Sequence, residues 1–267
     1  MTAIVLHPGF HKTGTSSIQH FLWLNRTALA PHLTIALLRH MKPLVQAAGR
    51  YSRSRDPKEL SDLSGAIDDL FAAVDPPDDW PLVISCEGLL GRLPGRPGYE
   101  DYDAAPELAA ALSRQLRQRR PGSPLRILLT TRRGGDWLSS VYRHQLFGTR
   151  LTLGGAEFGA RYARIAHLEA QADRIAAAAA PVPVERLPLE EAARHPLGPG
   201  GAFCARLGLP SQVLAALATV GQGNAGPAPD LWQQFLSLNR SDASDAEVRN
   251  EKARLAKAAG LGGWRVE

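Results

Sequence analysis

The segment with the clearest chemical potential is HPGFHKTGTSS, residues 7–17, which directly follows an apolar run at residues 3–6. It combines a lysine, two glycines and four hydroxyl side chains in front of a helical pattern. Unpaired backbone N–H groups at the start of a helix, together with the helix dipole, attract anions. The segment therefore predicts an anion-binding turn between a strand and a helix.

The position of the lysine argues against a nucleoside-triphosphate loop. That loop needs G-x-x-x-x-G-K-[ST], with the lysine directly after the second glycine. Gly9 and Gly14 have the right separation, but Thr15 follows Gly14 and the lysine is Lys12. We expect Lys12 to approach the far end of the ligand. Hydroxyl and backbone groups of four residues are expected around its inner phosphate: Thr13, Thr15, Ser16 and Ser17. The alternative is a tight turn that happens to be rich in glycine and threonine.

The sequence KTGTSS at residues 12–17 resembles the 5′-phosphosulfate loop of sulfotransferases that use 3′-phosphoadenosine 5′-phosphosulfate (PAPS). In that family the loop follows the first strand and has a K-[ST]-G-T-[ST] core. The resemblance implies a catalytic role for Lys12, the product adenosine 3′,5′-bisphosphate (PAP) and no required metal ion. It also implies that the nucleotide is bound by His11, Lys12, Thr13, Gly14, Thr15, Ser16 and Ser17.

A second motif lies in LLTTRRGGDWLSSVYRHQL, residues 128–146. In the same family, an arginine at the end of this strand and a serine eight residues later hold the 3′-phosphate of PAPS. Arg132 and Ser140 have that spacing, and Asp136, expected to cap the next helix, falls where the family usually has an acidic residue. A guanidinium fork suits a phosphate monoester. Arg133 replaces Arg132 if the register shifts by one. The pair Gly134-Gly135 departs from the family, and a surface arginine with a helix serine is the structural alternative.

Two residues compete for the general base that removes the acceptor proton. His20 lies on the expected first helix, where the carbohydrate sulfotransferases that this chain resembles have a glutamate, and imidazole accepts protons near neutral pH. Glu87 follows the third apolar run in PLVISCEGLLG, and similar bacterial sequences carry an S-x-E segment there. A solvated helix position for His20 and a helix N-terminal carboxylate for Glu87 are the structural alternatives. His7 and His11 flank the loop as further candidates.

The order of apolar runs and helical patterns predicts an α/β fold. Continuous apolar strands that alternate with helices indicate a central parallel sheet of about five strands with helices on both faces, P-loop-like. Strands are expected at residues 3–6, 33–38, 82–85, 126–131 and 182–187. Helices are expected at residues 15–25, 60–74, 106–119, 137–147, 162–180, 231–238 and 246–259. The two motifs would then meet at the carboxyl edge of the sheet.

We expect one domain over residues 1–267, with a nucleotide-binding core at 1–190 and a mainly helical C-terminal segment at 191–267. The formal net charge of +5 favours an anionic ligand without requiring nucleic acid. Two cysteines form no disulfide framework, and we see no signal peptide or membrane-spanning run. A cytoplasmic protein without stable membrane insertion is expected, and the sequence does not set its oligomeric state.

The expected reaction is transfer of a sulfonate group from PAPS to a hydroxyl or amine, such as one on a carbohydrate or glycolipid. One alternative is a P-loop kinase or NTPase, although the sequence shows no obvious magnesium-binding aspartate at the end of a strand. The other is a non-catalytic nucleotide-binding module.

Residues 40–62 and 88–105 are expected to form the acceptor cleft. Arg50, Arg53 and Arg55 would suit an anionic acceptor or a solvated face. The final GLGGWRVE weakly resembles a segment that closes over the nucleotide in some relatives, with Trp264 against adenine and Arg265 near phosphate. A frayed tail is the alternative there.

Overall fold

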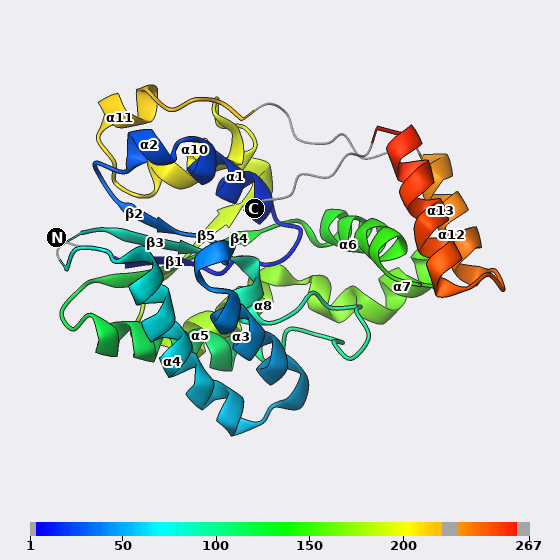
Figure 1. Cartoon of the computed structure of the whole chain (residues 1–267), viewed down its shortest axis with the longest axis horizontal. Helices are drawn as coiled ribbons and strands as arrows, with labels where there is room; N and C mark the ends of the chain where they lie inside the picture. The colour runs from blue at the N-terminus through cyan, green and yellow to red at the C-terminus, as the bar shows by residue number, and fades with distance from the viewer. Residues whose placement is uncertain (1–3, 79, 221–228, 261–267) are drawn as a thin grey trace.

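The centre of the protein is a five-stranded parallel sheet in the order β2-β3-β1-β4-β5. The structure is a computed structural model that describes residues 4–78, 80–220 and 229–260 (Figure 1). Its strands are β1 (Ile4–His7), β2 (Thr34–Ala36), β3 (Leu82–Ser85), β4 (Leu125–Thr131) and β5 (Val184–Pro188). The predicted α/β class, with a parallel sheet of about five strands, is confirmed.

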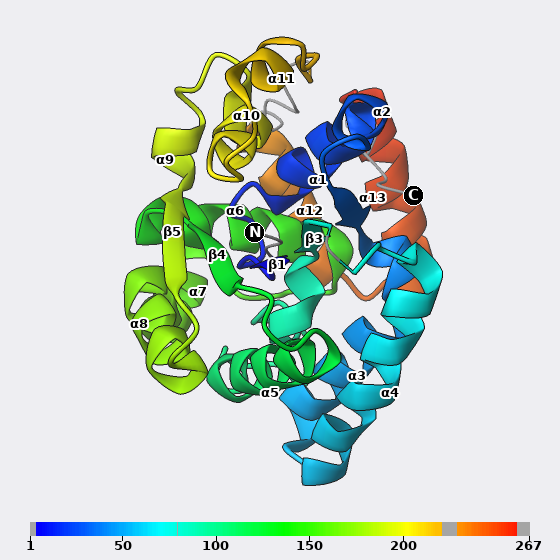
Figure 2. The ribbon, with the colours of Figure 1, turned by 90° about the vertical axis from the view of Figure 1, so that its left-hand side faces the viewer.

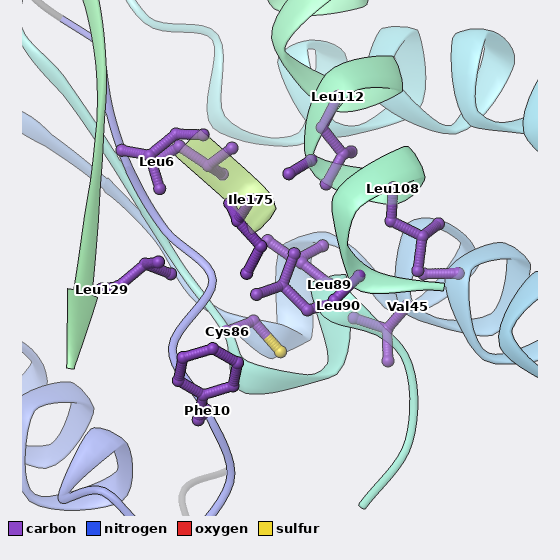
Figure 3. Close-up of a cluster of buried hydrophobic side chains, with 14 of the residues drawn as sticks. Leu6, Phe10, Val45, Cys86, Leu89, Leu90, Leu108, Leu112, Leu129 and Ile175 are labelled. Carbon is purple, nitrogen blue, oxygen red and sulfur yellow. The ribbon is translucent and has the colours of Figure 1, made fainter. Parts of the chain in front are cut away.

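Apolar side chains on both faces of the sheet explain why its strands read as continuous apolar runs. Within β1, Ile4 and Leu6 belong to one core cluster and Val5 belongs to the other. The first cluster is covered by α3 (Lys42–Ser54), α4 (Pro57–Val74), α5 (Ala105–Arg119) and α8 (Leu168–Ala179) (Figure 2). Figure 3 shows Leu6 and Leu129 in this cluster with Leu112 of α5 and Ile175 of α8.

The opposite face of the sheet is covered by the first and later helices of the chain (Figure 2). These are α1 (Thr15–Leu24), α2 (Arg26–Leu29), α10 (Gly198–Ala205) and α11 (Ser211–Ala215). A Cβ on Gly200 would lie 2.2 Å from Phe21, so a glycine is needed for α10 to pack this closely on α1. This contact holds the first helix, and hence the turn before it, against the sheet.

Three helices directly follow strands at the carboxyl edge of the sheet. The short helix η2 (Glu87–Leu90) follows β3, α6 (Gly134–Gly148) follows β4, and α9 (Leu189–Ala192) follows β5. The remaining described helices are η1 (Leu38–His40), α7 (Gly155–Tyr162) and η3 (Ala163–Ala166), together with α12 (Pro229–Arg240) and α13 (Asp245–Ala258). None of the helices within the described ranges is both long and apolar enough to cross a membrane.

The C-terminal pair α12 and α13 lies beside α6, away from the sheet (Figure 1). A small apolar cluster joins them: Leu146, Leu231, Phe235 and Ala256. Lys252 is only 2% exposed and its ammonium donates to the carbonyls of Leu146 and Thr149 at 2.9 and 2.8 Å. It also donates to the Asn239 side chain at 3.0 Å. The far end of α6 is therefore held by buried hydrogen bonds as well as by apolar packing.

The helix starts differ from those expected. The prediction that Asp136 caps α6 is wrong, because the helix begins at Gly134 with Arg133 as its N-cap. A Cβ on Gly134 would lie 2.9 Å from the Ala166 carbonyl oxygen, so glycine lets the helix start earlier in a tight space. The start of α1 also lacks a side-chain cap, since Gly14 is its N-cap.

Other differences concern segments without a clear apolar period. Most of residues 40–62 forms α3 and the start of α4, where no helix was predicted before residue 60. The predicted helix at residues 162–180 is divided into the end of α7, η3 and α8. The described part of residues 191–267 is mainly helical, as predicted. Trp264 and Arg265 lie outside the described residues.

Candidate functional site

The two predicted motifs meet at the carboxyl edge of the sheet, where open parallel sheets bind ligands. β1 lies between β3 and β4, with His7 in register with Ser85 and Leu6 with Ile127. Two hydrogen bonds join the loop after β1 to the segment after β4. Arg132 donates to the carbonyl of Lys12 at 3.1 Å, and the Trp137 indole donates to the carbonyl of His11 at 2.9 Å.

The loop after β1, residues 8–14, has an unusual backbone held in place by buried contacts. Gly9, Lys12 and Gly14 have φ values of +49°, +65° and +91°. Such values are uncommon for a non-glycine residue, so Lys12 needs support from its neighbours. The Thr13 hydroxyl lies 2.5 Å from the Phe10 carbonyl oxygen and 2.6 Å from the Thr130 hydroxyl. Buried hydrogen bonds within the protein therefore hold the backbone of the loop in place.

The predicted phosphate-binding hydroxyls divide into two groups. Thr13 and Thr15 are buried, and both hydroxyls lie against the Phe10 carbonyl and the Thr130 hydroxyl, beneath the loop. Ser16 and Ser17 are exposed on the first turn of α1. The first intrahelical bond of α1 runs from Ile18 N to the Gly14 carbonyl, so the preceding N–H groups have no partner within the helix. The groups available to an anion are thus backbone N–H groups and the two serines.

Lys12 lies between charges of both signs. Its pKa is lowered by burial and by the Arg132 guanidinium, and the Glu87 carboxylate acts in the opposite direction. Glu87 begins η2 and accepts a hydrogen bond from the Gln19 amide of α1 at 2.9 Å. The Cys86 N–H donates to the His7 carbonyl, which holds this segment to β1. The structure therefore brings Lys12 and Glu87 into one electrostatic neighbourhood. Gln19, which the sequence reading overlooked, orients Glu87.

The other base candidates have different surroundings. His20 follows Gln19 on α1 and is partly exposed; successive helix residues are rotated by about 100°, so it does not share the direction of Gln19 toward Glu87. His7 is buried, with its Nδ1 2.8 Å from the Ser85 hydroxyl and its ring against Phe203. Burial lowers the pKa of His7 to about 3, so it is neutral beneath the loop.

A cleft of about 470 Å³ lies next to Arg132. It is lined by Arg132, Arg133, Asp136, Leu189, Glu190, Ala193 and Arg194. We refer to it as the Arg132 cleft. Arg133 is exposed and forms ion pairs with Asp136 and Glu190 at 3.2 and 3.5 Å. Arg132 is half-buried and has no carboxylate partner within the described ranges. Of the two adjacent arginines, Arg132 is the one whose charge is available to a ligand.

Two further arginines near this cleft were missed from the sequence. Arg194 lines the cleft and follows β5, at the same edge of the sheet. Arg143 lies on α6. Burial lowers the pKa of Arg132; the charges of Asp136 and Glu190 oppose that shift, and the charge of Arg143 adds to it. Asp136, Ser140 and Arg143 are spaced by four and three residues and so share one face of α6. Ser140, a predicted ligand, is partly exposed on that face. Helical spacing could have identified Arg143 once α6 was recognised.

A second group of nitrogen-bearing side chains lies around His11, and we call it the basic cluster: His11, Lys12, Arg92, Arg96 and His144. The His11 Nδ1 lies 3.1 Å from the Tyr102 hydroxyl. Burial lowers the pKa of His11, and the charges of Arg96, His144, Arg92 and Lys12 lower it further. Burial, Lys12 and Arg96 lower the pKa of His144 to about 4. Both imidazoles are therefore neutral at pH 7.

Comparisons with known proteins give little further information. No protein-family model matches the chain, and no curated protein matches it. A crystal structure of a sulfotransferase from Alicyclobacillus acidocaldarius is similar over 97% of this chain and 96% of its own, with 19% sequence identity and a TM-score of 0.46. A likeness of this degree carries no argument about activity.

Proposed function

We propose that this protein is an enzyme that transfers a sulfonate group from PAPS to a hydroxyl or amine of a small-molecule or glycan acceptor. The proposal depends above all on the contact between Arg132 and the Lys12 carbonyl. That contact makes two separate anion-binding features neighbours along one edge of the sheet, as a nucleotide with phosphates at both its 5′ and 3′ positions requires.

The residues present suit such a nucleotide. The loop at residues 8–14 and the first turn of α1 offer backbone N–H groups for the 5′-phosphosulfate. The Arg132 cleft would take the 3′-phosphate, with Arg132 and Arg194 as guanidinium donors and Ser140 as a hydroxyl donor further along α6.

The chemistry assigned to the chain requires two groups besides the binding residues. The acceptor oxygen or nitrogen attacks the sulfur, the bond from sulfur to the bridging oxygen breaks, and its electron pair stays on PAP. The Lys12 ammonium stabilises the negative charge that develops on that oxygen. The acceptor proton passes to the Glu87 carboxylate, which the Gln19 amide orients. His20 is the competing base.

Calorimetry with PAP and with ADP plus Mg²⁺ tests this assignment directly. We expect PAP to bind at least tenfold more tightly than ADP with Mg²⁺, because an additional phosphate monoester meets Arg132. AMP, which lacks the 3′-phosphate, serves as the matched nucleotide for that contact. A preference for ADP with Mg²⁺ would contradict the proposal in favour of a kinase or NTPase. PAP binding without turnover of labelled PAPS on any acceptor would favour a non-catalytic module.

A further inference from the structure

The basic cluster contains cations that the protein itself does not neutralise. Across the described residues, neither Arg92 nor Arg96 forms an ion pair with a carboxylate. Of the three arginines that the sequence suggested for an anionic acceptor, Arg53 likewise forms no ion pair among the described residues, whereas Arg50 and Arg55 do. Arg50 pairs with Glu59 and Asp62 at 2.5 and 2.9 Å, and Arg55 pairs with Glu107 at 2.5 Å. The unpaired charge therefore lies on the segment after η2, where it acts on the His11 imidazole.

The fold makes room for Arg92 rather than leaving it to solvent. Gly49 of α3 is buried, and a Cβ at that position would lie 2.6 Å from the Nε atom of Arg92 and 3.2 Å from its guanidinium carbon. The guanidinium thus lies directly on the backbone of α3. A partly buried, unpaired arginine is costly unless another group supplies hydrogen bonds and charge.

The segment that carries Arg96 is held against α6. The Gln145 amide, buried on α6, donates to the Pro94 carbonyl at 3.1 Å. Gly95 N–H donates to the Tyr99 carbonyl at 2.8 Å, which closes a short turn containing Arg96. Arg96 is exposed on this turn, and its charge acts on the imidazoles of both His11 and His144, which places it near them.

The polar balance of this region is that of a site for an anion. Lys12, Arg92 and Arg96 are positive, and the carboxylate identified near Lys12 is Glu87. His11 and His144 contribute neutral imidazoles, and the Tyr102 hydroxyl is bonded to His11. Neutral imidazoles beside unpaired guanidinium groups can donate hydrogen bonds to an oxyanion without adding further charge repulsion.

We propose that the acceptor carries an anionic group, a carboxylate or a sulfate or phosphate ester, which Arg92 and Arg96 bind beside the hydroxyl that receives the sulfonate. This rests on the proposed function, because it places the acceptor at the basic cluster, whose residues do not line the Arg132 cleft. Gly49 is a positioning residue that gives Arg92 its place.

Matched acceptors that differ only in charge test the inference with labelled PAPS. Suitable pairs are methyl glucuronoside with methyl glucoside, and 4-hydroxybenzoate with 4-hydroxybenzamide. We expect at least one anionic member to show a kcat/KM at least tenfold above that of its neutral partner. In an Arg92→Gln/Arg96→Gln variant this ratio should fall below threefold, chiefly through KM. Arg50→Gln, which removes an ion-paired arginine from the neighbouring helix, should leave the ratio unchanged.

A binding measurement separates this inference from the proposed function. The same compounds are titrated by ligand-observed NMR, with and without saturating PAP, against the unmodified protein and the double variant. PAP binding without any preference for the anionic members would overturn the anion site and leave the proposed function standing. A preference that disappears in the double variant, in a protein that does not bind PAP, would support the anion site and refute the proposed function. Equal losses for anionic and neutral members would also overturn the inference.

Discussion

The Arg132 cleft and the basic cluster differ in how their positive charges are paired. In the Arg132 cleft, Asp136 and Glu190 form ion pairs with the exposed Arg133, and the half-buried Arg132 forms none among the described residues. In the basic cluster, Arg92 and Arg96 also form no ion pair with a carboxylate in the part of the chain that the structure describes. Arginines without a carboxylate partner, rather than the total number of arginines, indicate where anionic groups of ligands bind.

The difference extends to how each is built. The loop at residues 8–14 is held by buried hydroxyl contacts to β4, including the pair Thr13 and Thr130. The basic cluster depends on the turn after η2, which Gln145 holds to α6, and on Gly49 of α3. The first arrangement suits a ligand of constant shape and the second suits recognition of one charged substituent.

The variant with the largest expected effect is Lys12→Ala. We expect kcat for transfer from labelled PAPS to fall by about 10²–10³-fold, the usual effect of losing a group that stabilises developing charge. The dissociation constant of PAP, measured by calorimetry, should change much less. Normal turnover by this variant would show that the loop at residues 8–14 has another role.

Replacing the base comes next in expected effect. Glu87→Gln keeps the side-chain shape but removes the proton acceptor, and we expect kcat to fall by about 10²-fold. His20→Gln is the matched change on the competing residue. Steady-state rates with labelled PAPS compare the two, and a larger loss for His20→Gln would transfer the role of base from Glu87 to His20.

Two adjacent arginines test the proposed role of the Arg132 cleft. Arg132→Gln should weaken PAP binding by about 10–100-fold, because a charge-assisted hydrogen bond is worth about 1.5–3 kcal/mol. Arg133→Gln should have little effect, since its charge is already paired with Asp136 and Glu190. Calorimetry with PAP and AMP gives the measurement, and an equal loss of affinity for both nucleotides would remove the assigned contact between Arg132 and the 3′-phosphate.

Titration of His144 tests the arrangement of the basic cluster. Its pKa of about 4 is held down by burial, Lys12 and Arg96, so Arg96→Gln should raise it. The unfolded chain binds protons near pH 6.5. The stability contributed by neutral His144 is therefore fully present above that pH and is lost as the pH falls toward 4. NMR of the imidazole follows the pKa, with Arg133→Gln as the control; an unchanged value in Arg96→Gln would place Arg96 away from the cluster.

The smallest expected effect is that of Gly49→Ala. The new methyl group would displace the Arg92 guanidinium, a flexible side chain, without requiring the backbone to move. We expect KM for an anionic acceptor to rise by a few-fold, while KM for its neutral partner stays the same. Gly65→Ala on α4, where a Cβ meets nothing within 4 Å, is the matched control. A rise in both KM values would instead indicate a general distortion of α3.

Much of the fold was predictable because strands buried on both faces have continuous apolar sequences. The motif around Lys12 and the Arg132 segment were predictable because both follow such strands. Helix starts were not, since the caps at Gly14 and Arg133 depend on contacts with distant residues. The significance of Arg92 over Arg50 was also beyond the sequence, because it depends on which arginines find carboxylates in three dimensions. Arg194 lacks any local signal and becomes a candidate only once β5 is placed at the sheet edge.

The buried ammonium of Lys252 has a consequence for the whole active edge. It satisfies carbonyl oxygens at the last turn of α6, where the helix dipole is negative and a cation is favourable. The same helix carries Ser140 and His144, which belong to the proposed nucleotide and acceptor sites. Because α12 and α13 hold the end of this helix, they help to set the distance between the two proposed sites.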